Sequence, residues 1–85
     1  MYEIMFRNKK MRKKLEYYVS LRRDIIDKLN RLKINPRGEC GAHLLHGNLF
    51  GKWACWFGSN IRMVYKIDDI NRIIVVERVG SHNVY

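Results

Sequence analysis

The strongest constraint on the fold is a change of hydrophobic period near the middle of the chain. Before Asn35-Pro36, apolar residues recur every three or four positions, as in helices that bury one side. After Lys52, apolar residues alternate with polar ones or run together, which is typical of strands. Since 85 residues are too few for two hydrophobic cores, both halves must share one core. The sequence therefore predicts a single α+β domain that spans residues 1–85.

The first half predicts a strand followed by two helices. A short apolar run at residues 2–6 indicates the strand. Asn8 is the expected N-cap of the first helix, whose apolar positions are Met11, Leu15 and Tyr18. Ser20 is the expected N-cap of the second helix, whose apolar stripe consists of Leu21, Ile25, Leu29 and Leu32, with Ile26 beside it. Asn35-Pro36 ends this helix, because the residue before a proline is disfavoured in the α region.

The second half predicts three consecutive antiparallel strands. Their expected ranges are 52–57, 61–67 and 72–79, and the turns between them contain Gly58-Ser59-Asn60 and Asp68-Asp69-Ile70-Asn71. The complete order is β-α-α-β-β-β. It describes a helical hairpin packed on a small, mainly antiparallel twisted sheet.

The net charge of +9 is concentrated in one segment. Residues 7–37 contain twelve basic and three acidic side chains, whereas the remaining residues contain five of each sign. A net charge of this size exceeds the usual magnitude of roughly 2–8 for a small domain. It indicates a polyanionic partner, which can be a nucleic acid, an acidic protein or an anionic membrane. A solvated helical face is the simpler explanation of the same lysines.

The sequence gives no sign of a membrane span, a signal peptide or a disulfide framework. Its unbroken apolar runs, such as Trp53–Phe57 and Ile73–Val76, are far too short to span a membrane, so we expect the chain to remain in the cytoplasm, with Cys40 and Cys55 reduced. These cysteines, together with His43 and His46, have a spacing that is uncommon in zinc sites. We therefore expect no metal site and no cofactor.

Side chains suited to acid–base chemistry and phosphate binding occur mainly in the second half. They are His43, His46, Arg62, Arg78, His82 and Tyr85. A histidine can transfer protons near neutral pH, an arginine can hold a phosphate through two hydrogen bonds, and an aromatic ring can stack on a base. Together they are the components of RNA cleavage in which a ribose hydroxyl attacks its own phosphate.

Each of these residues also has a structural interpretation. The two loop histidines are compatible with simple surface residues, and Arg62 with an ion pair to Glu77 or Asp69 across the sheet. Large aromatic residues usually belong to the core, which is the expectation for Trp53, Trp56 and Phe57. Because side chains alternate between the two faces of a strand, Trp56 falls on the face opposite to Trp53 and Phe57, which is the position of an exposed residue.

Three motifs, in order, resemble those of the RelE/ParE superfamily of toxins. They are Asn35-Pro36-Arg37 with residues 42–53 (AHLLHGNLFGKW), residues 61–69 (IRMVYKIDD), and the ending at residues 79–85 (VGSHNVY). In family terms these are the L-x-G-x-x-x-G-x-W, R-x-x-Y-x-I and G-x-H…V-Y signatures. The resemblance covers essentially the whole chain, and the order of predicted elements agrees with it.

The resemblance implies the toxin of a type II toxin–antitoxin pair that cleaves mRNA on the ribosome without a metal. Arg62 matches the arginine that contacts the scissile phosphate in RelE- and YoeB-like nucleases. His43 falls where the YafQ-like branch has a catalytic histidine. His82 falls where such nucleases have a His or Arg near the end of the last strand, and Tyr85 matches the terminal aromatic residue.

The implied partners are an acidic antitoxin, the ribosome and mRNA. We expect the RNA- and ribosome-binding residues to be Lys9, Lys10, Arg12, Lys13, Lys14 and Arg78. The alternatives are a ParE-like inhibitor of DNA gyrase and a catalytically inactive relic that still binds its antitoxin.

Overall fold

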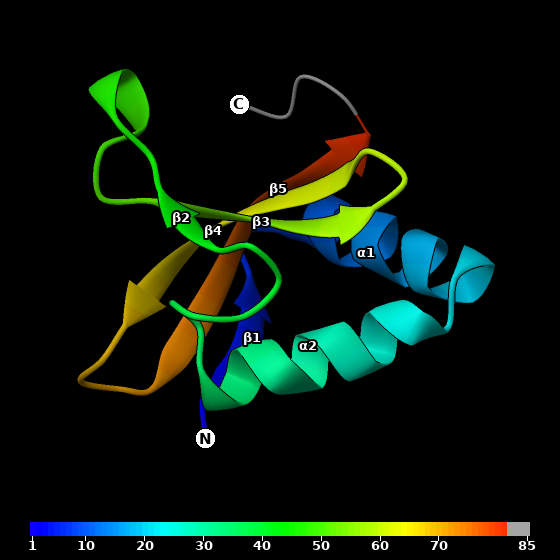
Figure 1. Cartoon of the computed structure of the whole chain (residues 1–85), viewed down its shortest axis with the longest axis horizontal. Coiled ribbons are helices and arrows are strands. Elements are labelled where there is room, and N and C mark those ends of the chain that lie inside the picture. Colours follow the sequence, from blue (N-terminus) through cyan, green and yellow to red (C-terminus); the bar gives the residue numbers. More distant parts are fainter. Residues whose placement is uncertain (82–85) are drawn as a thin grey trace.

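Two helices pack against one face of a five-stranded sheet in the computed structural model (Figure 1). The structure describes residues 1–81. Its elements are β1 (Glu3–Phe6), α1 (Lys9–Leu21), α2 (Asp24–Ile34), β2 (His43–Leu44), the 3-10 segment η1 (Gly47–Leu49), β3 (Trp53–Gly58), β4 (Ile61–Asp68) and β5 (Ile73–Ser81). The predicted α+β class and the order of the main elements are confirmed. The two-residue strand β2 and η1 were not predicted.

The order of strands in the sheet is β1-β5-β4-β3-β2. The pairs β2–β3, β3–β4 and β4–β5 are antiparallel, whereas β1 pairs in parallel with β5. Parallel neighbours need a long connection, and here all the other elements lie between the two strands in sequence. Because the first and last strands of the described chain pair with each other, β5 is an interior strand, with β1 on one side and β4 on the other.

The core lies between this sheet and the two helices. Leu15 of α1 and Leu32 of α2 are buried against Phe57, Met63 and other sheet residues of one face. The fully buried Tyr65 is part of the same cluster, and its hydroxyl donates a 2.6 Å hydrogen bond to the carbonyl oxygen of Pro36. This bond attaches the segment after α2 to the sheet and satisfies a polar group that would otherwise be buried at a cost.

The prediction for the start of α1 is confirmed, and the prediction for the start of α2 is wrong. Asn8 caps α1, since its side-chain oxygen accepts a 2.9 Å hydrogen bond from the Met11 amide. Ser20 lies inside α1, and its hydroxyl donates to the carbonyl oxygen of Tyr17. Leu21, predicted to line the stripe of the second helix, is the last residue of α1 and is 61% exposed. The second helix begins only at Asp24.

A tertiary contact explains this boundary between the helices. The Arg22 guanidinium donates to the carbonyl oxygens of Phe57 (2.7 Å) and Gly58 (3.1 Å) at the end of β3. It also forms an ion pair with Asp24, the first residue of α2. Arg22 therefore connects the turn between the helices to the sheet, and local sequence does not reveal this contact.

The turn between β3 and β4 is the tight hairpin that its sequence predicts. Ser59 and Asn60 both have positive φ, as in the two-residue turns that match the twist of antiparallel strands.

Within residues 1–81, no helix is long and apolar enough to cross a membrane.

Candidate active site

The sheet face that turns away from the helices contains the candidate site. Directly opposed residues of antiparallel strands extend their side chains to the same face, so the register groups them. Trp56 of β3 lies opposite Arg62 of β4, and Arg62 lies opposite Gly80 of β5. Trp56 is 55% exposed, so the expectation that it belongs to the core is wrong and its parity gave the correct indication, whereas Phe57 is fully buried in the helix-facing core. An aromatic ring, a guanidinium and a residue without a side chain therefore form one row across the open face.

Arg62 makes neither of the two ion pairs considered from the sequence. Glu77 pairs with Lys52 at 3.1 Å, and Asp69 pairs with Arg37 at 2.8 Å. Among residues 1–81, no carboxylate lies within ion-pair distance of Arg62, which is half-buried. A guanidinium that no carboxylate of the described chain neutralises is suited to bind an anion such as phosphate.

A β-bulge in β5 brings a second arginine to this face. Val64 lies opposite Arg78, but the next residue, Tyr65, lies opposite Val76, so Glu77 is an extra residue in β5. Tyr65 and Val76 both belong to the core beside the helices. Because the extra residue changes the phase of the strand, Arg78 shares the open face with Val64, and its side chain is exposed.

Beside the bulge, a shielded ion pair stabilises the same face. The Lys52 Nζ atom lies 3.1 Å from Glu77 Oε1, and the two side chains are only 23% and 11% exposed. Next to the pair, Ala54 and Val64 lie opposite each other and are fully buried, although neither belongs to the core beside the helices. The open face thus has a small packed layer of its own. Sequence reasoning missed this ion pair; its signal is a single glutamate in the otherwise apolar start of the last strand.

His43 belongs to the same face, at the edge of the sheet. It is the first residue of β2 and lies opposite Ala54, two residues before Trp56. Its Nδ1 atom lies 3.1 Å from the carbonyl oxygen of Gly41. Because a carbonyl only accepts hydrogen bonds, this contact favours the neutral tautomer that carries its proton on Nδ1 and leaves the lone pair on Nε2. His43 and Arg62 are two strands apart in the sheet and differ by two residues along the strand direction. At the usual spacing of strands and residues, their Cα atoms are therefore about 12 Å apart.

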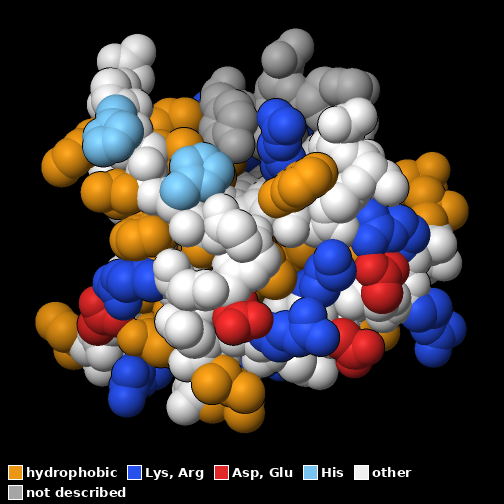
Figure 2. All heavy atoms as spheres, viewed as in Figure 1, with side chains coloured by type: hydrophobic (Ala, Val, Ile, Leu, Met, Phe, Trp, Pro, Cys, Tyr) orange, Lys and Arg blue, Asp and Glu red, His pale blue; other side chains and the backbone are white. Residues whose placement is uncertain are grey.

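The other predicted residues of the site differ in how the structure places them. His46 is exposed and precedes η1 without making a side-chain cap. Figure 2 shows the two described histidines (pale blue) on one face of the molecule. His82 and Tyr85 lie outside the described residues. The structure therefore groups Trp56, Arg62 and Arg78, and it adds His43 at the edge of the same face.

The two cysteines do not join this group. Cys55 points into the core beside the helices, on the opposite side of the sheet from His43. Burial raises the pKa of the Cys55 thiol and also that of the half-buried Cys40 thiol, so both stay protonated at neutral pH. In the part of the chain that the structure describes, no three His, Cys, Asp or Glu side chains form a group able to hold a metal ion.

The predicted basic surface follows α1. Lys9, Lys10, Lys13 and Lys14 are all exposed, and the guanidinium of the exposed Arg12 lies 5.7 Å from the centre of the Phe6 ring. Glu16 is the only acidic residue in α1. Since α1 packs on the face opposite to the candidate site, the basic surface and the site lie on different sides of the sheet.

No family model and no curated protein matches this sequence. Solved structures do match its three-dimensional arrangement. A YoeB/ParE toxin from Agrobacterium tumefaciens superposes with a TM-score of 0.75 at 17% identity, covering 95% of this chain and 99% of that one. A chain of the YoeB–YefM complex from Staphylococcus aureus gives 0.73 at 20% identity, covering 98% of this chain and 99% of that one. A YafQ mutant from E. coli gives 0.64 at 19% identity, covering 96% and 94%.

The chain has the fold of RelE/YoeB-like toxins. The fold expected from the sequence motifs is therefore confirmed over nearly the whole length of each neighbour. At 17–20% identity the likeness concerns the fold, so the chemistry of this chain must be argued from its own side chains. Those side chains are the guanidinium of Arg62, which no carboxylate of residues 1–81 pairs with, the exposed ring of Trp56 and the histidine at the edge of the open face.

Proposed function

We propose that this chain is the toxin of a type II toxin–antitoxin pair and acts as a ribosome-dependent mRNA endonuclease. The observation that carries the proposal is Arg62, which is half-buried on the open face and has no carboxylate partner among residues 1–81. Trp56 lies directly opposite and offers an exposed ring on which a base can stack. Solved structures of the same fold are named as toxins, which supports the same assignment.

The proposed reaction uses the ribose of the substrate as the nucleophile. The 2′-oxygen forms a bond to the adjacent phosphorus, the bond from phosphorus to the 5′-oxygen breaks, and the products are a 2′,3′-cyclic phosphate and a free 5′-hydroxyl. His43 accepts the 2′-hydroxyl proton at Nε2, and a second group returns a proton to the leaving 5′-oxygen. Arg62 stabilises the additional negative charge on the phosphorane.

Two further roles follow from the sequence resemblance. We assign His82 the second proton-transfer position and Tyr85 the orientation of the nucleotide; both residues lie outside the described range. Either histidine can serve as the base if the other serves as the acid. Arg78, which shares the open face with Arg62, is proposed to contact the RNA backbone beside the scissile phosphate.

The proposed partner is a cognate antitoxin with an acidic segment that folds on binding. The net charge of +9 favours an acidic partner, and one neighbouring structure is a YoeB–YefM complex. Copurification of the two products of the native two-gene operon tests this partner. An unchanged melting temperature after addition of the purified neighbouring gene product would contradict it.

Single-turnover cleavage of mRNA on programmed ribosomes tests the nuclease. Arg62→Ala is expected to lower the rate by about 10²–10³, because the phosphorane loses its fixed positive partner. Arg31→Ala is the matched control, since Arg31 is an exposed arginine of α2 on the other side of the sheet. Absence of cleavage by the wild-type protein would refute the nuclease, whereas wild-type cleavage by a folded Arg62→Ala variant would refute the role given to Arg62. Inhibition of gyrase supercoiling by the same protein would then support the ParE-like alternative.

A further inference from the structure

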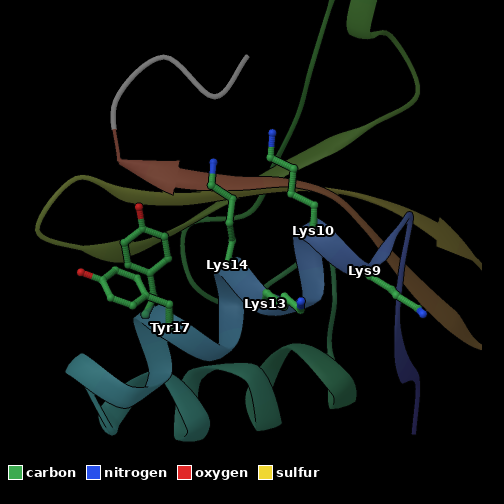
Figure 3. A pocket seen from close by; sticks show the side chains of 6 residues that line it. Lys9, Lys10, Lys13, Lys14 and Tyr17 are labelled. Atoms are coloured by element: carbon green, nitrogen blue, oxygen red, sulfur yellow. The ribbon is translucent and has the colours of Figure 1, made fainter.

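An open hollow of about 560 Å³ lies along α1 and has no part in the chemistry proposed above. It is lined by Lys9, Lys10, Lys13, Lys14, Tyr17 and Tyr18. Figure 3 shows Lys10 and Lys14 leaving the helix in the same direction, one turn apart, with Tyr17 on the next turn. This volume lies within the range of about 300–1,000 Å³ that is usual for small-ligand sites.

The charge of this hollow is entirely positive. Of the six residues within 1–81 that line it, four are lysines and none is acidic. Glu16, the only acidic residue of α1, lines a different groove between the two helices. Because neighbouring lysines repel one another, such a cluster favours an anionic ligand, and two ammonium groups one helical turn apart suit consecutive phosphates.

The second feature of the hollow is a supported aromatic ring. Tyr17 is 60% exposed, which is unusual for a side chain of this size. Its ring meets Tyr18 edge to face, with the ring centres 5.5 Å apart, and Tyr18 packs partly against the core. Tyr18 therefore limits the movement of the Tyr17 ring while much of that ring remains accessible. A flat, supported and accessible ring beside cations is the arrangement on which a nucleobase stacks.

We propose that this hollow binds one unpaired nucleotide of a single-stranded RNA. The base stacks on Tyr17, and Lys10 and Lys14 contact the phosphates on either side. An acidic peptide would satisfy the lysines but would make no use of the ring, which is why the observations favour RNA. The proposal deepens the function proposed above, from which it takes RNA as the ligand class. It adds a contact to the RNA through α1, a different element from the strands that carry Trp56 and Arg62.

The test measures binding alone, with RNA that cannot be cleaved. The probe is a fluorescent 2′-O-methyl oligonucleotide, which lacks the attacking hydroxyl, and its fluorescence anisotropy is titrated with the isolated protein. A failure of the nuclease proposal is thus separated from a failure of this one. Tyr17→Ala is expected to weaken binding about 5- to 150-fold, whereas Tyr17→Phe, which keeps the ring, stays close to wild type.

The contribution of the lysines is measured through salt dependence. The double variant Lys10→Gln/Lys14→Gln is expected to reduce the slope of log affinity against log salt by about 1.4, or about 0.7 for each lost phosphate contact. The matched control is the double variant Arg23→Gln/Arg31→Gln, which removes the same charge from two exposed positions. Arg23 is the N-cap residue of α2, and Arg31 lies within that helix. An equal loss in both double variants would overturn the proposal, because general electrostatic attraction would then explain the binding.

Two further probes identify the ligand class. An abasic oligomer of the same length and charge is expected to bind the wild type and Tyr17→Ala equally, because it has no base to stack. If the wild type binds it as tightly as it binds the full oligonucleotide, the stacking site is refuted. A polyglutamate peptide is expected to bind without any dependence on Tyr17. If its binding weakens with Tyr17→Ala as much as that of RNA, the hollow is a site for acidic peptides instead.

Discussion

Removal of either partner of the Lys52–Glu77 ion pair is expected to destabilise the protein, and by unequal amounts. Glu77 is the less exposed partner, at 11%, and sits in the bulge of β5. Lys52→Ala leaves this carboxylate shielded from water and without a cation. Glu77→Ala leaves the Lys52 ammonium, which is 23% exposed and can reach water by a small movement of its flexible stem. Lys52→Ala should therefore be the more costly change.

The magnitude follows from the exposure of the two side chains. Exposed ion pairs contribute about 0.2–1 kcal/mol, whereas loss of one partner of a fully buried pair costs about 3–5 kcal/mol. This pair lies between the two cases. We expect Lys52→Ala to lower the free energy of unfolding by about 2–3 kcal/mol and Glu77→Ala by about 1–2 kcal/mol. The double variant should lose less than the sum, with a coupling energy of about 1–2 kcal/mol.

Urea unfolding followed by tryptophan fluorescence measures all four proteins of this cycle. The slope of the free energy with urea should be unchanged, so that a lower midpoint reports stability alone. Lys66→Ala is the matched control, since Lys66 is an exposed lysine of β4 and should change stability by less than about 0.5 kcal/mol. A coupling energy below about 0.3 kcal/mol would refute the reasoning, because independent sites are additive within such a margin.

Three other predictions concern stability and catalysis. The Arg37 guanidinium, through hydrogen bonds of 3.0 and 2.8 Å, lowers the pKa of Asp69 from 3.8 to about 2. The carboxylate therefore stabilises the fold fully above about pH 4, and the difference in melting temperature between wild type and Asp69→Asn should shrink as the pH falls toward 2. Leu32→Ala should lower the free energy of unfolding by about 2–5 kcal/mol, whereas the exposed Leu21→Ala should change it by less than about 0.5 kcal/mol, both measured in urea. His43→Ala should reduce single-turnover cleavage by about 10²–10⁴ without loss of the circular dichroism of the fold, and wild-type cleavage would exclude His43 as the base.

Local sequence was sufficient to predict most elements of the fold. Residues that are close in the chain set the signals for these elements. The signals are the helical spacing of the apolar positions that include Leu15 in α1 and Leu32 in α2, the Asn8 cap and the alternation in β4. These signals predicted the α+β class, and they marked Trp56 as the one aromatic residue whose parity departed from the expected core position, because side-chain periodicity depends only on backbone geometry. The candidate site was predicted in part: Arg62 was identified from a motif, whereas only the structure shows that no carboxylate within residues 1–81 pairs with it.

The remaining features depend on contacts between distant residues. Arg22 sets the start of α2 through carbonyl groups of β3, and β1 finds its parallel partner in β5. The bulge at Glu77 shifts the alternation of side chains along β5. Every second residue faces the helices before the bulge, and the opposite alternate residues face them after it. Sequence alone determined where backbone periods change and which side chains are available for chemistry. Only the tertiary structure decided which of those side chains share a face, because the insertion of one residue in a strand reverses the direction of every side chain beyond it.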